Sequence, residues 1–164
     1  MSMPDCTVLA CIDALLLANA EALDDKNMQA WLETFSTATE ASYVCNSAES
    51  VKAGRSIALM LDDCRARLED RVSFVNRIWQ GTYQDYQTRH MVQRTRCTAL
   101  GPGRYAVKTN FIIAFTPVDT GTAELLSTGV YQDTVVTSDS GAVLLSRLVI
   151  TDTSYLPHYI VYPL

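Results

Sequence analysis

The first third of the chain has the apolar spacing of two amphipathic helices. Between Val8 and Ala20, apolar side chains recur every three or four residues, which places them on one helical face opposite a polar one. Asp24 or Asp25 can cap a second, shorter helix by accepting its free backbone N–H groups. The apolar side of that helix consists of Met28, Trp31, Leu32 and Phe35. We expect Trp31 and Phe35 to fill the junction between this helix and the core.

A short strand and a longer helix follow in the pattern. Residues 40–45 include Tyr43 and Val44 and lead into a polar stretch, which predicts a strand ending in a loop that contains Gly54. Helical spacing returns over residues 56–79, where the apolar positions are Ile57, Met60, Leu61, Cys64, Leu68, Val72, Val75 and Ile78. The charged residues between them, from Asp62 to Arg71, are typical of a solvated helix face with ion pairs four residues apart.

After residue 87 the pattern changes to long strands divided by turn signals. The three turns are Gly101-Pro102-Gly103, Asp119-Thr120-Gly121 and Asp139-Ser140-Gly141, which predict three consecutive hairpins in an antiparallel meander. Helices followed by a strongly curved antiparallel sheet make an α+β fold, in which the sheet wraps around the long helix as a cone or half-barrel. No linker or repeat divides residues 1–164, so we expect a single domain.

Composition and charge narrow the functional classes. The net charge is −5 and the pI is about 4.9, and the 13 basic residues are interspersed with acids, which argues against nucleic-acid binding. The five cysteines form no Cys-x-x-Cys pair, so a secreted disulfide framework is not expected. Asp13 and Asn19 interrupt the first apolar run, and no basic residue precedes it, which fits neither a signal peptide nor a membrane span. We expect a cytoplasmic protein.

Several short sequence motifs along the chain, taken in order, match those of a known protein family. They are Met28-Gln29-Ala30-Trp31-Leu32-Glu33-Thr34-Phe35, Leu68-Glu69-Asp70-Arg71-Val72, Thr88-Arg89-His90-Met91-Val92, Thr128-Gly129-Val130-Tyr131-Gln132-Asp133, Leu145-Ser146-Arg147-Leu148-Val149 and Tyr162-Pro163-Leu164. In this order the sequence resembles the small, or beta, subunit of bacterial aromatic-ring-hydroxylating dioxygenases, the Rieske non-haem iron oxygenases. Their fold is the nuclear-transport-factor-like, or SnoaL-like, cone, which is also described as cystatin-like.

The resemblance implies a non-catalytic structural subunit with an iron-bearing partner. In this family the small subunit assembles with a large, or alpha, subunit, commonly three copies of each, and the large subunit carries a Rieske [2Fe-2S] cluster and a mononuclear iron. Electrons from NAD(P)H reach such a complex through a reductase, in some cases by way of a ferredoxin. The present chain has no Cys-x-His string for a Rieske centre, and a two-histidine iron site would need both His90 and His158. We therefore expect neither cofactor nor metal in this chain.

The same cone fold hosts enzymes, so a stand-alone lyase or isomerase is the alternative. Residues expected to face one another across the cone are Tyr43, Asp63, Arg71, His90, Asn110, Tyr131 and Arg147. A dehydratase could use His90 with Tyr43, although the second histidine of the dehydratase pattern is missing here. An isomerase could use Asp63 or Asp133 as base with a tyrosine as donor.

A structural interpretation competes with these enzymatic ones. Asp63, Arg71, His90 and Arg147 would then form one polar network that fixes the long helix onto the sheet. Three aromatic residues, Trp79, Tyr83 and Tyr86, lie in a polar segment and form either a contact region for another subunit or a loop folded onto its own domain. The apolar residues 155–164 are expected to pack on the sheet or to be buried in assembly.

Overall fold

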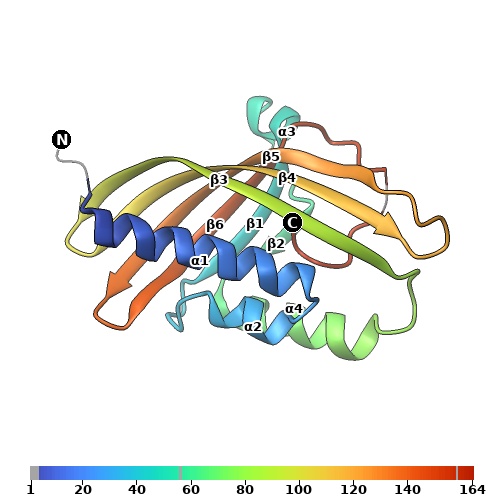
Figure 1. The fold of residues 1–164 in the computed structure, drawn as a ribbon, viewed down its shortest axis with the longest axis horizontal. Coiled ribbons are helices and arrows are strands. Elements are labelled where there is room, and N and C mark those ends of the chain that lie inside the picture. Colours follow the sequence, from blue (N-terminus) through green and yellow to red (C-terminus); the bar gives the residue numbers. More distant parts are fainter. Residues whose placement is uncertain (1–3, 56, 158) are drawn as a thin grey trace.

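A six-stranded sheet curves around the first helix of the chain (Figure 1). The computed structural model describes residues 4–55, 57–157 and 159–164. The helices are α1 (Cys6–Asp24), α2 (Met28–Glu33), α3 (Ala48–Lys52) and α4 (Arg65–Ser73), and α4 continues into one π-helical turn, η1 (Phe74–Ile78). The strands are β1 (Ser42–Ser47), β2 (Met60–Asp62), β3 (Tyr86–Gly101), β4 (Arg104–Pro117), β5 (Glu124–Ser138) and β6 (Gly141–Thr151). The α+β fold with a curved sheet is confirmed.

The sheet combines the predicted meander with two strands from the first half of the chain. Its order is β2-β1-β6-β5-β4-β3, and the pairs β3/β4, β4/β5 and β5/β6 are antiparallel hairpins, as their turn residues predict. The sheet is not wholly antiparallel, however, because β1 pairs with β6 in parallel. That pairing joins Tyr43 to Arg147 across about two thirds of the sequence, and no local turn signals it.

The predicted helix over residues 56–79 is wrong in its first part. Met60 and Asp62 are buried and Leu61 is exposed, because these three residues form β2 at the sheet edge and pair with β1. The helix begins only at Arg65, and it buries Leu68 and Val72 as predicted. Ser56 lies outside the described residues. Apolar spacing alone did not distinguish three residues of strand from the start of a helix.

The joint between α1 and α2 differs from the predicted cap. Asn27, rather than Asp24 or Asp25, caps α2, since its Oδ1 accepts the N–H of Ala30 at 3.0 Å. Lys26 has a positive φ of 55°, which turns the chain sharply between the two helices. Asp24 therefore ends α1, and its carboxylate is available to the sheet.

The first helix is a core helix. By length and composition alone, α1 could cross a membrane. Its side chains Ile12, Leu16 and Leu23 are instead buried in the protein core, and the helix packs on β3 and β6. The apolar face of α1 is thus covered by the curved sheet.

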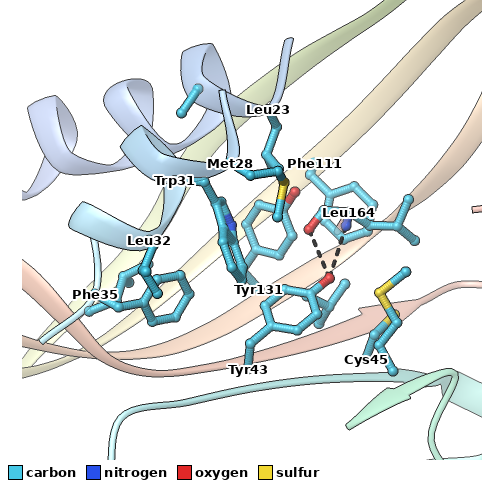
Figure 2. Close-up of a cluster of buried hydrophobic side chains, with 14 of the residues drawn as sticks. Leu23, Met28, Trp31, Leu32, Phe35, Tyr43, Cys45, Phe111, Tyr131 and Leu164 are labelled. Carbon is cyan, nitrogen blue, oxygen red and sulfur yellow. Dashed lines mark hydrogen bonds between the residues drawn. The ribbon is translucent and has the colours of Figure 1, made fainter. Parts of the chain in front are cut away.

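Aromatic rings fill the space between the helices and the sheet, as Figure 2 shows. Trp31 and Phe35 are 0% and 2% exposed with ring centroids 4.9 Å apart, which confirms that they fill the junction between α2 and the core. Phe111 on β4 stacks on Tyr131 of β5 at 4.5 Å. Leu164 enters the same cluster from the far end of the described chain.

The Phe111 stack depends on Gly129, its partner on β5, and this gives a stability prediction. A Cβ at Gly129 would run into the Ile150 carbonyl oxygen and lie 2.8 and 2.9 Å from two carbons of the Phe111 ring. We expect Gly129→Ala to lower the free energy of unfolding by about 1–3 kcal/mol or more, because the backbone cannot yield as a side chain can. Chemical denaturation measures this value.

Gly101→Ala is the matched control, since a Cβ there meets nothing within 4 Å. Its free energy of unfolding should stay within about 0.5 kcal/mol of the unmodified protein. Equal losses at the two positions would contradict the steric explanation.

Candidate functional site

The structure does not bring the seven predicted pocket residues into one site. Tyr43, Tyr131 and Arg147 lie inside the cone, and the His90 side chain is only 3% exposed. Asn110 and Asp63 are exposed, and Arg71 on α4 is half-buried. The predicted single network of Asp63, Arg71, His90 and Arg147 is therefore wrong, because these four residues belong to separate pairs.

The first of these pairs joins Arg147 to Asp133 in the interior. The guanidinium Nε and NH2 donate to the two carboxylate oxygens of Asp133 at 3.0 and 2.8 Å, and both side chains are at most 2% exposed. NH1 donates to Oδ1 of Asn19 on α1 at 2.6 Å, and the guanidinium also lies 4.1 Å from the Tyr131 ring centre. Asn19 in turn donates to Thr34 Oγ1 at 2.7 Å. This chain of hydrogen bonds joins β5, β6 and α1 to the end of α2.

The second pair joins His90 on β3 to Asp24 at the end of α1. The imidazole Nδ1 lies 2.6 Å from Asp24 Oδ1, and the backbone N–H of His90 donates to Oδ2 at 3.0 Å. Thr88 adds a hydroxyl hydrogen bond at 3.0 Å. Burial raises the pKa of the Asp24 carboxyl, but the hydrogen bonds and charge of His90, with the hydroxyl of Thr88, outweigh it and bring that pKa below 3.8. The carboxylate beside His90 is Asp24, not Asp63.

The third pair lies at the surface end of β2. Arg71 donates through Nε and NH2 to the two oxygens of Asp62 at 2.9 and 3.1 Å, which fastens α4 to the sheet edge. Asp63 points outward and forms an exposed pair with Arg67 at 3.2 Å. The difference between Asp62 and Asp63 follows from β2, where successive side chains alternate between faces.

The Tyr43 hydroxyl is hydrogen-bonded to the backbone of Leu164 and therefore does not face an open substrate space. It accepts the N–H of Leu164 at 2.9 Å and donates to the carbonyl oxygen of Leu164 at 3.2 Å (Figure 2). Complete burial raises the pKa of the Tyr43 hydroxyl well above 10.0. Tyr43 is thus not placed to exchange protons with His90 through a bound molecule.

The interior of the cone is nearly full. The space beside His90 measures about 10 Å³, which is room for about one water molecule. The sheet and helix side chains around it include Leu23, Ile113 and Leu126, and the rest of its wall comes from residues 160, 162, 163 and 164. The prediction that residues 155–164 pack on the protein is met for residues 161 and 164, which are 2% exposed, whereas Tyr155 is 75% exposed.

The predicted aromatic contact region is partly buried. Tyr86 is 2% exposed and packs edge-on against Phe115, so it is a core residue and not a surface contact. Tyr83 is half-buried, and its hydroxyl lies 2.7 Å from that of Tyr162. Trp79 is half-buried against Phe74, with ring centroids 5.6 Å apart.

An open groove of about 440 Å³ lies beside this region, lined by Lys26, Val75, Gln80, Tyr83, Asp85 and Tyr162. The hydrogen bond from the Lys26 ammonium lowers the pKa of Asp85. Two apolar side chains of η1 stand out into solvent nearby, since Phe74 is 43% and Ile78 59% exposed. Such exposed apolar groups around a groove are typical of a protein contact surface.

The described residues offer no metal site. Within residues 4–55, 57–157 and 159–164, no three His, Cys, Asp or Glu side chains lie close enough together to hold a metal ion. His158, which a two-histidine iron site would require, is outside the described residues. The donor set around His90 is a single carboxylate, which does not fit an iron centre.

The sequence analysis missed the acidic partners Asp24 and Asp133 and the amide of Asn19. Counted back from the turn at residues 139–141, Asp133 would lie opposite Ser146, but a bulge at Leu145 of β6 moves it opposite Arg147. The partner of His90 had a weaker signal. An aspartate at the last position of a helix is unfavourable beside the carbonyl end, so its presence suggested a partner elsewhere.

Comparison with known proteins gives one family. A family model described as "Ring hydroxylating beta subunit" matches residues 18–158. No curated protein sequence matches the chain. The sequence and the fold thus point to the same group of proteins.

Solved structures show the same fold. The beta subunit of a candidate aromatic-ring-hydroxylating dioxygenase from Novosphingobium aromaticivorans DSM 12444 is 25% identical with a TM-score of 0.78, over 89% of this chain and 90% of that one. The beta subunit of benzoate 1,2-dioxygenase from Burkholderia mallei ATCC 23344 is 23% identical with a TM-score of 0.72, over 92% and 93%. A candidate scytalone dehydratase from N. aromaticivorans DSM 12444 is 15% identical with a TM-score of 0.66, over 93% and 89%, and shares the fold.

The buried Arg147 pair gives a second stability prediction. We expect Arg147→Met to lower the free energy of unfolding by about 3–5 kcal/mol, because it leaves the Asp133 carboxylate buried without its counter-charge. Replacing both partners, as in Arg147→Met with Asp133→Leu, should recover most of that loss. Chemical denaturation at neutral pH gives the comparison.

Arg67→Met is the matched control, since its pair with Asp63 is 55% exposed on both sides. It should change the free energy of unfolding by no more than about 0.5–1 kcal/mol. A similar loss for Arg67→Met and Arg147→Met would contradict the role of burial.

The Asp24 pair predicts a dependence on pH. Its pKa is lower in the folded than in the unfolded chain, so its stabilisation is complete above pH 4 and is lost as the pH falls through the folded value. We expect Asp24→Asn to lower the free energy of unfolding at pH 5 by about 1.5–3 kcal/mol, the usual range for a hydrogen bond to a charged group. The difference from the unmodified protein should shrink towards pH 2.

Denaturation curves at several values between pH 2 and 5 measure this trend, with Asp25→Asn at the exposed neighbouring position as control. A constant difference across that range would contradict the assigned role of the carboxylate.

Proposed function

Because the chain belongs to the ring-hydroxylating beta subunit family, we propose that it is the non-catalytic structural subunit of an aromatic-ring-hydroxylating dioxygenase in aromatic compound catabolism. The observation that carries this proposal is the family match over residues 18–158. The closed interior supports it, since the space beside His90 measures only about 10 Å³. A subunit of this kind contributes surfaces and not chemistry.

The chemistry then belongs to a partner. We assign the Rieske [2Fe-2S] cluster and the mononuclear iron to a large, alpha subunit, because the described residues here contain no fitting donor set. Three copies of each subunit would make the complex, a reductase, with or without a ferredoxin, would deliver its electrons, and the assembly would work in the cytoplasm. The net charge of −5 gives no support to a nucleic-acid partner.

The contact surface that we propose for assembly is the region around η1 and the loop that follows it. Phe74 and Ile78 present exposed apolar groups, Trp79 packs behind Phe74, and Tyr83 borders the adjoining groove. Aromatic and apolar side chains next to a groove are the usual centre of a protein interface. Tyr86 supports this region from the core.

The lyase or isomerase alternative has less support. His90 does have a carboxylate partner in Asp24, but a substrate would need to lie against the imidazole, where residues 162–164 now pack. Tyr43, its proposed partner, binds the backbone of Leu164 instead. An enzymatic role would require these residues to move away.

Co-expression with the large subunit of such a dioxygenase tests the proposal. We expect a complex containing equal numbers of both chains by native mass spectrometry, and Ile78→Asp should weaken it about tenfold or more, because a charge would be buried against an apolar surface. Leu100→Asp, at the distant β3–β4 hairpin and 57% exposed, is the matched control and should assemble normally.

Two results would contradict the proposal. One is a chain that remains separate from every large subunit offered and converts a small carbonyl or hydroxylated compound by itself. The other is a complex that assembles with His90→Gln but loses ring hydroxylation, since that would give this chain a part in the chemistry.

A further inference from the structure

One polar atom inside the cone has no hydrogen-bond partner where one is expected. His90 Nδ1 faces the Asp24 carboxylate, which only accepts, so Nδ1 carries a proton and Nε2 is the remaining polar atom of the ring. Nε2 is buried and unpaired in the structure. Buried polar atoms are nearly always satisfied, so this atom requires an explanation.

The atom borders a space whose other walls suit an apolar ligand. Leu23, Ile113, Leu126 and the Tyr86 ring surround the cavity on the side of the helix and sheet. The remaining wall is the 160–164 segment, which has no regular secondary structure and contributes Ile160, Tyr162, Pro163 and Leu164 to the lining. The segment leaves only about 10 Å³ free.

The 160–164 segment fits this space by shape but does not meet the polar atom. Pro163 has no N–H, and the N–H of Leu164 is already donated to the Tyr43 hydroxyl. The Tyr162 hydroxyl lies against that of Tyr83, outside the cavity wall beside His90. The segment therefore covers His90 without satisfying Nε2.

Apolar packing and hydroxyl contacts hold the segment in place. Val161 and Leu164 are 2% exposed and belong to the core. Tyr43 binds both backbone groups of Leu164, the N–H of Val161 lies 3.5 Å from the Tyr86 hydroxyl, and Tyr83 holds Tyr162. None of these five residues belongs to a helix or strand, so the segment can leave the interior without breaking the hydrogen bonds of the sheet.

We propose that the 160–164 segment closes a latent binding site for a small phenol, with His90 as its polar anchor. When the segment moves out, an aromatic ring takes its place among the apolar side chains, and the phenol hydroxyl donates to Nε2. A hydroxyl also accepts, so it would bind the protonated ring equally. Ligand and segment compete for one space.

A variant with a smaller side chain in the 160–164 segment makes room for a ligand, so that binding can be measured. Leu164→Ala removes the side chain that fills the cluster, and calorimetric titration of the full chain with phenol and with toluene compares a ligand that can meet Nε2 with one of similar shape that cannot. We expect Leu164→Ala to bind phenol at least tenfold more tightly than the unmodified chain does, and to prefer phenol over toluene at least tenfold. Leu68→Ala, an equally buried leucine on α4, is the matched control and should show no such preference.

Nitrogen-15 NMR of the His90 ring in the unmodified chain gives a second measurement, which does not depend on how the variant folds. Phenol should shift the Nε2 signal, because its hydroxyl forms a hydrogen bond with that atom, whereas toluene should not. The proposal is overturned if Leu164→Ala binds phenol and toluene equally or no more tightly than the unmodified chain. It is also overturned if the variant does not fold and phenol leaves the Nε2 signal unchanged, as it would if a buried water already occupied the site. Assembly with the large subunit has no part in either measurement, so the two proposals fail independently.

Discussion

The buried pair of Arg147 and Asp133 is the constraint around which this cone is arranged. Neither charge can remain in the interior alone, so the guanidinium needs both carboxylate oxygens and a further acceptor, Asn19 of α1. Those three groups come from β6, β5 and α1, and they fix how the helix lies on the sheet. Because Arg147 also pairs in register with Tyr43 of β1, the same position determines where the parallel strand joins.

Filling of the interior follows from the same arrangement. The hydrogen bonds from Arg147 through Asn19 to Thr34 hold α1 and the end of α2, which place Leu23 and Trp31 over the sheet. Leu164 occupies the remaining volume with its backbone bound to Tyr43. The closed interior is thus formed by a few residues of irregular chain that pack between the helices and the sheet.

Local patterns in the sequence were sufficient to predict most of the helices and strands. The meander of β3 to β6 could be predicted because its turns contain Gly and Asp at the required positions, and the apolar faces of α1 and α2 because their spacing is helical. The parallel β1–β6 pair and the three residues of β2 could not be predicted, since contacts distant in sequence determine them. The partners of the polar residues could not be predicted for the same reason. His90 and Arg147 were identified correctly as interior groups, but their partners depend on a bulge in β6 and on which residue caps α2.

Asp24 shows how a local conflict can mark a site that residue types alone do not. Its carboxylate stands at the carbonyl end of α1, where the helix dipole disfavours negative charge. The hydrogen bonds from His90 and Thr88 offset that cost, and the result is an imidazole held in one orientation at the inner wall of the cone. If the only role of this arrangement were to attach α1 to β3, the backbone N–H of His90 and the Thr88 hydroxyl would suffice. The oriented ring and its unpaired Nε2 are more than attachment requires. The proposed ligand would give this unpaired atom a hydrogen-bond partner, which the attachment of α1 to β3 does not.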